Sequence, residues 1–107
     1  MMATDDLLHI ETEVVQVLKN TYDPEIPVNI YDLGLIYKID VDDHNQVEIT
    51  MTLTAPNCPM ADELLVEIKE KVEAIEGVKA TAINLTFDPP WDKNMMSEEA
   101  LLELGLL

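Results

Sequence analysis

The sequence predicts a two-layer α+β domain in which two helices cover one face of a small mixed sheet. Two segments carry apolar residues at three- and four-residue spacing, the period of an α-helix, and three are expected as half-buried strands. They follow the order helix, strand, strand, helix, strand, with a short helix at the end. Alternating strands have one polar face, so the helices should lie together on the other face. The length of 107 residues suits one core, and we expect one domain over residues 1–107.

The first helix is expected over residues 4–21. Its apolar face is formed by Leu7, Ile10, Val14 and Leu18. Pro24 and Pro27 follow, and each disfavours the helical conformation of the residue before it. The helix should therefore end there and give way to an ordered loop.

A β-hairpin is expected next. Every second residue from Leu35 to Val41 is apolar, with Tyr37 among them, and the same alternation returns from Val47 to Leu53. The polar run between the two segments is typical of a turn. The two segments should therefore pair as neighbouring strands.

A second helix is expected after Pro59. The apolar residues on one face are Ala61, Leu64, Leu65, Ile68, Val72 and Ile75. Glu67 stands four residues before Lys71, and Gly77 is well placed to end the helix. The second helix therefore carries the signals of an amphipathic helix that packs on the sheet.

A third strand is expected over residues 78–87. Its apolar parity slips between Ala82 and Ile83, as a bulge or a twist would cause. A proline-rich turn then leads to a short helix with Ser97 as its N-terminal cap. These elements complete the α+β order.

The charge excludes two classes of partner. The chain has 22 acidic and 6 basic residues, a net charge of −16, and no arginine. Clustered basic residues bind polyanions, so nucleic acid and anionic membrane surfaces are disfavoured. The sequence has no run of eighteen apolar residues and no signal-peptide pattern at its start, so we expect a cytoplasmic protein.

Cys58 is the only cysteine, and we expect it to carry the function. It precedes Pro59, a residue favoured at the first helical position, so its thiol should face the N-terminus of the second helix. The unpaired N–H groups there favour the thiolate, which binds metals and attacks electrophiles. The alternative is a small buried cysteine without a chemical role. One thiol cannot supply a four-thiolate site, so any cluster must borrow ligands.

Five further residues are candidates for a supporting site. Asp23 and Glu25 lie in the proline-stiffened loop, either as metal ligands, proton acceptors or partner contacts, or as part of a solvated turn. Thr54 ends the second strand, where its hydroxyl could bond the sulfur or the neighbouring loop, and Asn57 is placed to cap the second helix. Trp91 follows two prolines and acts either as a lid across the site or as ordinary packing.

Three separated motifs resemble one family. Residues 23–37 read DPEIPVNIYDLGLIY, residues 54–59 read TAPNCP, and residues 88–91 read DPPW with MSEEA shortly after. In this order they resemble the SufT and PaaD-like metal-sulfur cluster biosynthesis proteins. The resemblance implies the fold of iron-sulfur cluster assembly domains and a role in maturing iron-sulfur proteins. It also implies a reactive position at Cys58, with Asp23, Glu25 and Thr54 near it.

Three functional hypotheses follow from these observations. The first is an accessory factor without turnover that uses Cys58 to contact iron, a cluster bound transiently, or a client's cysteine. Its partners would be iron-sulfur assembly proteins or client apoproteins, and a homodimer would offer two thiols. The second, an enzyme with a cysteine nucleophile, is disfavoured because neither His9 nor His44 is placed as its base. The third is an interaction module in which Cys58 only packs.

Overall fold

The computed structural model describes residues 4–23, 26–54 and 61–106. Its elements are α1 (Thr4–Lys19), β1 (Ile36–Val41), β2 (Gln46–Met51), α2 (Ala61–Glu73), β3 (Ala80–Leu85), the 3₁₀ turn η1 (Lys93–Met95) and α3 (Glu98–Glu103). The predicted order of helix, strand, strand, helix, strand and short helix is confirmed. Within the described part of the chain, no helix is long and apolar enough to cross a membrane.

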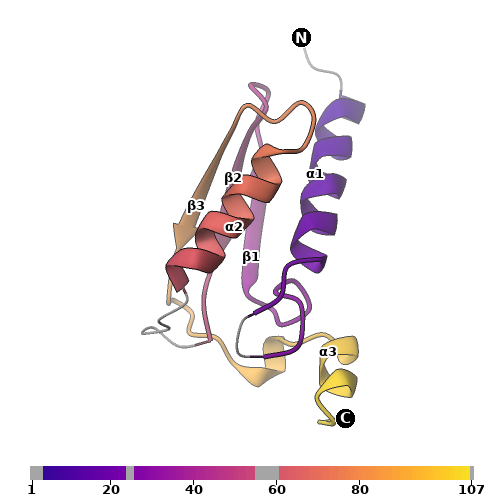
Figure 1. Ribbon diagram of the computed structural model, residues 1–107, viewed down its shortest axis with the longest axis vertical. Helices are drawn as coiled ribbons and strands as arrows, with labels where there is room; N and C mark the ends of the chain where they lie inside the picture. The colour runs from indigo at the N-terminus through magenta and orange to yellow at the C-terminus, as the bar shows by residue number, and fades with distance from the viewer. Residues whose placement is uncertain (1–3, 24–25, 55–60, 107) are drawn as a thin grey trace.

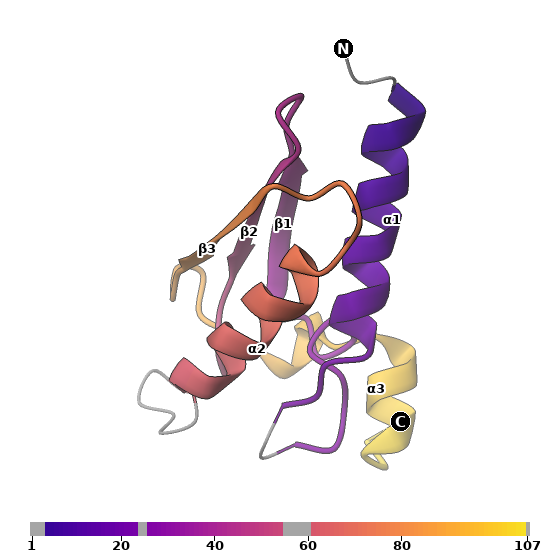
Figure 2. The same ribbon diagram turned by 45° about the horizontal axis from the view of Figure 1, so that its top comes forward.

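The sheet is mixed and has the strand order β1-β2-β3. β1 and β2 pair antiparallel, as a hairpin requires, and β2 and β3 pair parallel, with α2 as the crossover between them. α1 packs against β1 and against α2, and α2 packs against β3 (Figure 1). Figure 2 shows both helices on the same side of the strands. The two-layer α+β architecture is therefore confirmed.

The core lies between this helical layer and the sheet, on the faces that periodicity predicts. The buried helix residues are Ile10, Val14 and Leu18 of α1 and Leu64, Ile68 and Val72 of α2. From β2 the buried residues are Val47, Ile49 and Met51. The predicted core position of Leu7 lies outside the described side chains. The loop between α1 and β1 also contributes Val28, Ile30, Leu33 and Leu35, so this loop is part of the core.

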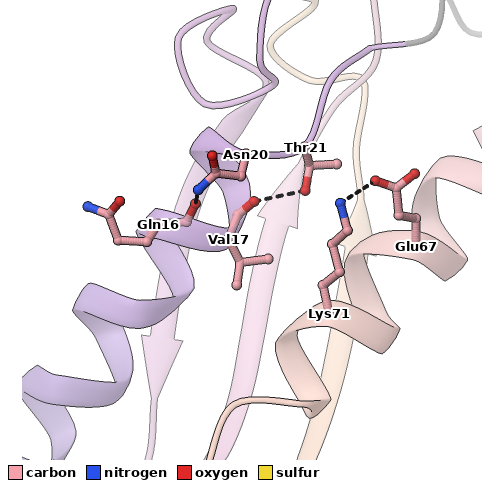
Figure 3. Close-up of polar contacts among 6 residues, drawn as sticks. All are labelled: Gln16, Val17, Asn20, Thr21, Glu67 and Lys71. Carbon is pink, nitrogen blue, oxygen red and sulfur yellow. Dashed lines mark hydrogen bonds and ion pairs between the residues drawn. The ribbon is translucent and has the colours of Figure 1, made fainter.

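The last turn of α1 is closed by side chains. The Thr21 hydroxyl donates to the Val17 carbonyl at 2.8 Å, and the Asn20 amide donates to the Gln16 carbonyl at 2.7 Å (Figure 3). The Asn20 backbone N–H also donates to both carbonyls, each at 3.1 Å. Side-chain and backbone donors therefore close the C-terminal turn, and α1 ends at Lys19, two residues before the predicted end.

The pairing of Glu67 with Lys71 on the second helix is present. The two side chains of α2 form an ion pair at 2.7 Å (Figure 3).

The hairpin turn between β1 and β2 is held by one carboxylate. The Asp42 carboxylate accepts hydrogen bonds from the backbone N–H groups of His44 and Gln46, each at 2.9 Å. The hydrogen bond from Gln46 is the main reason why the pKa of Asp42 lies below its usual value.

The predicted parity of β1 is wrong at one residue. Tyr37 was expected on the core side, but the pairing is irregular between Ile36 and Lys38, and Ile36 lies opposite Met51. Tyr37 instead donates its hydroxyl to the Pro89 carbonyl at 2.7 Å. The irregularity therefore turns an aromatic side chain toward the C-terminal segment.

The third strand has no bulge between Ala80 and Leu85, since its register with β2 is regular there, so that alternative for the slip at Ala82 and Ile83 is wrong. The slip in the pattern has another cause. Thr81 is polar but buried, and its backbone N–H donates to the Glu73 carboxylate at 3.1 Å. Ala82 is exposed and lies on the opposite, open face.

Candidate functional site

Several element ends meet at one end of the molecule. β2 and β3 finish there, α2 begins there, and the loop leaving α1 and the segment after β3 lie beside them (Figures 1 and 2). Binding and catalytic residues are concentrated on loops that a rigid scaffold holds in this way. Most residues of the motifs singled out in the sequence belong to these connections, and the rest belong to the start of β1 and to α3.

Cys58, Asn57 and Glu25 lie outside the described residues. Cys58 belongs to the connection between Met51, the last residue of β2, and Ala61, the first residue of α2. The proposed position of its thiol at the helix N-terminus and the capping role of Asn57 therefore stay predictions.

The start of α2 has an electrostatic feature that the prediction for Cys58 did not include. The first turn of α2 carries Asp62 and Glu63. The positive end of the helix dipole favours a thiolate nearby, whereas two carboxylates disfavour it. A thiolate at this helix end, as predicted for Cys58, would therefore be subject to two opposing electrostatic effects.

Asp23 is a buried, hydrogen-bonded residue with a relative exposure of 7%. Its Oδ1 accepts a hydrogen bond from the Ile26 backbone N–H at 3.1 Å, and its own N–H donates to the Val28 carbonyl at 3.4 Å. The alternative of a solvated turn is therefore wrong for Asp23, which holds together the two ends of the 23–28 loop. A role for this carboxylate toward a metal or a proton stays a prediction.

Thr54 is half-buried and follows Leu53, which belongs to the core. The chain just before it is held by a hydrogen bond from the Thr52 N–H to the Leu35 carbonyl at 2.9 Å. Thr54 thus stands where an ordered extension of β2 enters the connection that carries Cys58. Its hydrogen bond to the sulfur or to the neighbouring loop stays a prediction.

Trp91 is half-buried and packs against the core. Its indole N–H donates to the Leu33 carbonyl at 2.7 Å. Gly34, the next residue, has a φ of +84°, and a Cβ there would collide with the backbone carbonyl of Met95. The segment that carries Trp91 is therefore packed closely on the turn at residues 33–34. The packing interpretation of Trp91 agrees with these contacts, and its role as a lid stays a prediction.

The turn that receives the C-terminal segment was not predicted from the sequence. Asn29 and Asp32 exchange two hydrogen bonds at 2.8 and 2.9 Å, and the Ser97 N–H donates to the Asp32 carbonyl at 2.8 Å. The available signals were a glycine within an apolar stretch at Gly34 and a pair of Asx residues three apart. These residues fix the position of α3, whose N-terminal cap is Ser97 as predicted.

The described residues contain no group of three or more His, Cys, Asp or Glu side chains that could hold a metal ion. His9 and His44 are exposed, as expected. His44 lies in the turn between β1 and β2, at the opposite end of the molecule from the start of α2 (Figure 1). It is therefore not placed to act as a base for a thiol near α2.

Comparisons with known proteins agree with the motifs. A family model described as "Iron-sulfur cluster assembly protein" matches residues 11–85. The chain is 56% identical over 103 residues to the "Fe-S protein maturation auxiliary factor" of Porphyromonas gingivalis, covering 96% of this chain and 98% of the relative. It is 39% identical over 84 residues to the "Fe-S protein maturation auxiliary factor SufT" of Staphylococcus aureus, covering 78% and 96%.

A solved structure has the same fold. The crystal structure of a domain of unknown function from Bacillus anthracis matches with a TM-score of 0.89 and 32% sequence identity. The match covers 98% of this chain and 100% of that chain. The arrangement of helices and strands described above is therefore shared along the whole length of a solved relative.

Proposed function

The chain belongs to the iron-sulfur cluster assembly protein family, and from this premise we propose that it is an accessory factor in the maturation of iron-sulfur proteins. The observation that carries the proposal is the match over 96% of the chain to a maturation auxiliary factor of almost the same length. The match also covers 98% of that relative, so its named role belongs to the part that the two chains share. In this proposal the protein acts in the cytoplasm, together with assembly proteins or client apoproteins.

In this proposal Cys58 is the point of contact with the cargo. It is the only thiol of the chain, and thiolates are the usual protein ligands of iron-sulfur clusters. One thiol falls short of the four ligands that a [2Fe–2S] cluster usually has, so a partner, a small thiol or a second copy completes the site. Iron or a cluster is thus held transiently and passed on.

The proposal requires no turnover by the protein itself. The relatives are named auxiliary factors. A cysteine enzyme needs a base close to its nucleophile, and His44 is held at the far end of the sheet. Transfer of iron or a cluster between proteins needs only an accessible thiolate and a docking surface. A domain of this size can provide both.

The test is deletion of the gene for this protein in its host. The measurement is the specific activity of an iron-sulfur enzyme, normalised to the amount of that enzyme. The proposal predicts that specific activity falls while the amount of polypeptide stays constant, and that the wild-type chain restores it. The matched control is an enzyme of the same host that has no cluster. An equal fall in both enzymes, or no fall in either, would contradict the proposed role.

A further inference from the structure

A groove of about 610 Å³ separates the loop after α1 from α3. Its lining includes the buried residues Val28 and Ala100. Tyr22 and Leu102 also line it and are exposed to 58% and 61%. Large side chains exposed beside a buried apolar floor are typical of a protein contact surface, and tyrosine is enriched among residues that dominate binding energy.

The same groove carries a concentrated negative charge. Asp32, Glu99 and Glu103 line it, and among its described lining residues there is no lysine. The pairing of Asp32 with the Asn29 amide leaves the charge of its carboxylate uncompensated, because an amide is neutral. A ligand that fills this groove must therefore bring positive charge as well as apolar surface.

The walls of the groove are fixed to each other before any ligand binds. The Ser97 N–H at the start of α3 donates to the Asp32 carbonyl at 2.8 Å, and the Ser97 side chain caps α3 through the Ala100 N–H at 3.1 Å. Tyr22 forms an isolated β-bridge with Asn29 on the opposite side of the loop. Binding to a preformed groove avoids much of the entropic cost of ordering a loop.

We propose that this groove docks a segment of a partner protein in which an arginine or lysine stands next to an aliphatic residue. The cationic group lies among the carboxylates of Asp32, Glu99 and Glu103, and the aliphatic side chain packs against Tyr22 and Leu102. A second copy of the chain is a poorer occupant, because both copies carry a net charge of −16 and each has only 6 basic residues against 22 acidic ones. The proposed contacts are made by described residues only, and the docking goes beyond the proposed function.

The test is a ¹H–¹⁵N NMR titration of the full chain with the peptide acetyl-Leu-Arg-Leu-amide. The control is acetyl-Leu-Gln-Leu-amide, which keeps the apolar groups and loses the charge. We expect the arginine peptide to shift the backbone amides of the groove residues, and the glutamine peptide to bind about five-fold more weakly or worse, as the loss of exposed ion pairs implies. Equal binding of the two peptides, or no shifts from either, would overturn the proposal.

Variants separate the groove from the general negative charge of the protein. Glu99→Gln combined with Glu103→Gln should weaken the arginine peptide about five-fold. Glu98→Gln is the matched control, because Glu98 is exposed on the same helix but does not line the groove. An equal loss in control and double variant, or shifts centred outside the groove, would overturn specific docking. Cys58→Ser should bind the peptide normally, because the proposed contacts do not include this residue. If the wild-type chain does not bind the peptide, the docking proposal fails, while the proposed maturation role is unaffected.

Discussion

Replacing Gly34 with alanine is expected to loosen the C-terminal segment from the turn on which it packs. Gly34 has a φ of +84°, where an L-residue is strained by roughly 1 to 2 kcal/mol. The new Cβ would also collide with the carbonyl of Met95. Displacing this segment would break the hydrogen bonds of Trp91 to Leu33 and of Tyr37 to Pro89. Each contributes about 1 kcal/mol net to the free energy of unfolding. The total loss in the free energy of unfolding should be about 3 to 4 kcal/mol.

The assay is urea unfolding followed by fluorescence, and the chain offers a built-in reporter. Trp91 is the only tryptophan and belongs to the segment that should move. Gly34→Ala should therefore lower the urea midpoint and also alter the tryptophan emission of the folded protein, because the environment of the indole changes.

Gly105→Ala is the matched control for backbone strain. Gly105 has a φ of +71°, but a Cβ there would meet no atom of the described residues within 4 Å. Its cost should be limited to strain of roughly 1 to 2 kcal/mol, without a change in folded-state emission. Equal losses of stability in the two variants, with unchanged Trp91 emission in both, would refute the reasoning about the packed turn.

Three further predictions concern single side chains. Alkylation of Cys58 should have a pH midpoint below about 8.5. Neutralising Asp62 and Glu63 together should lower this midpoint further. A midpoint at or above about 8.5 in the wild-type chain would contradict activation by the helix terminus. The pKa of the Asp42 carboxyl, followed by NMR, should lie below its ordinary value of 3.8. The stability that its hydrogen bonds contribute is therefore present above that pH and is lost as the pH falls through the folded-state pKa. A higher midpoint would contradict the bonded turn. Asp23→Ala should cost about 1 to 3 kcal/mol in urea unfolding because it removes the acceptor of the Ile26 N–H, and an unchanged midpoint would argue against loop closure.

The parts of the fold that follow from local periodicity could be predicted from the sequence. The apolar spacing on α2 identified Leu64, Ile68 and Val72, which are all buried. The same reasoning failed at Tyr37 and Thr81, where a pairing irregularity and a buried polar residue changed the pattern. Periodicity reports which face a residue occupies only while the strand is regular and its core is apolar.

The candidate site was less predictable because its contacts connect distant parts of the chain. The burial of Asp23 depends on how the whole loop packs, and the bond from Trp91 to Leu33 spans 58 residues. No local pattern encodes such a contact. The motifs drew attention to Asp23 and Trp91, and their hydrogen-bond partners became known only from the structure.

The claim that the protein acts through its one thiol is tested most directly by Cys58→Ser in cells that lack the wild-type chain. The measurement is the specific activity of an iron-sulfur enzyme, normalised to its protein level, with circular dichroism and the urea midpoint of the purified variant as controls for folding. If the protein acts through this thiol, folded Cys58→Ser fails to restore activity, while a substitution at the exposed Asn84 of β3 restores it fully. Normal restoration by folded Cys58→Ser would show that the thiol is not needed.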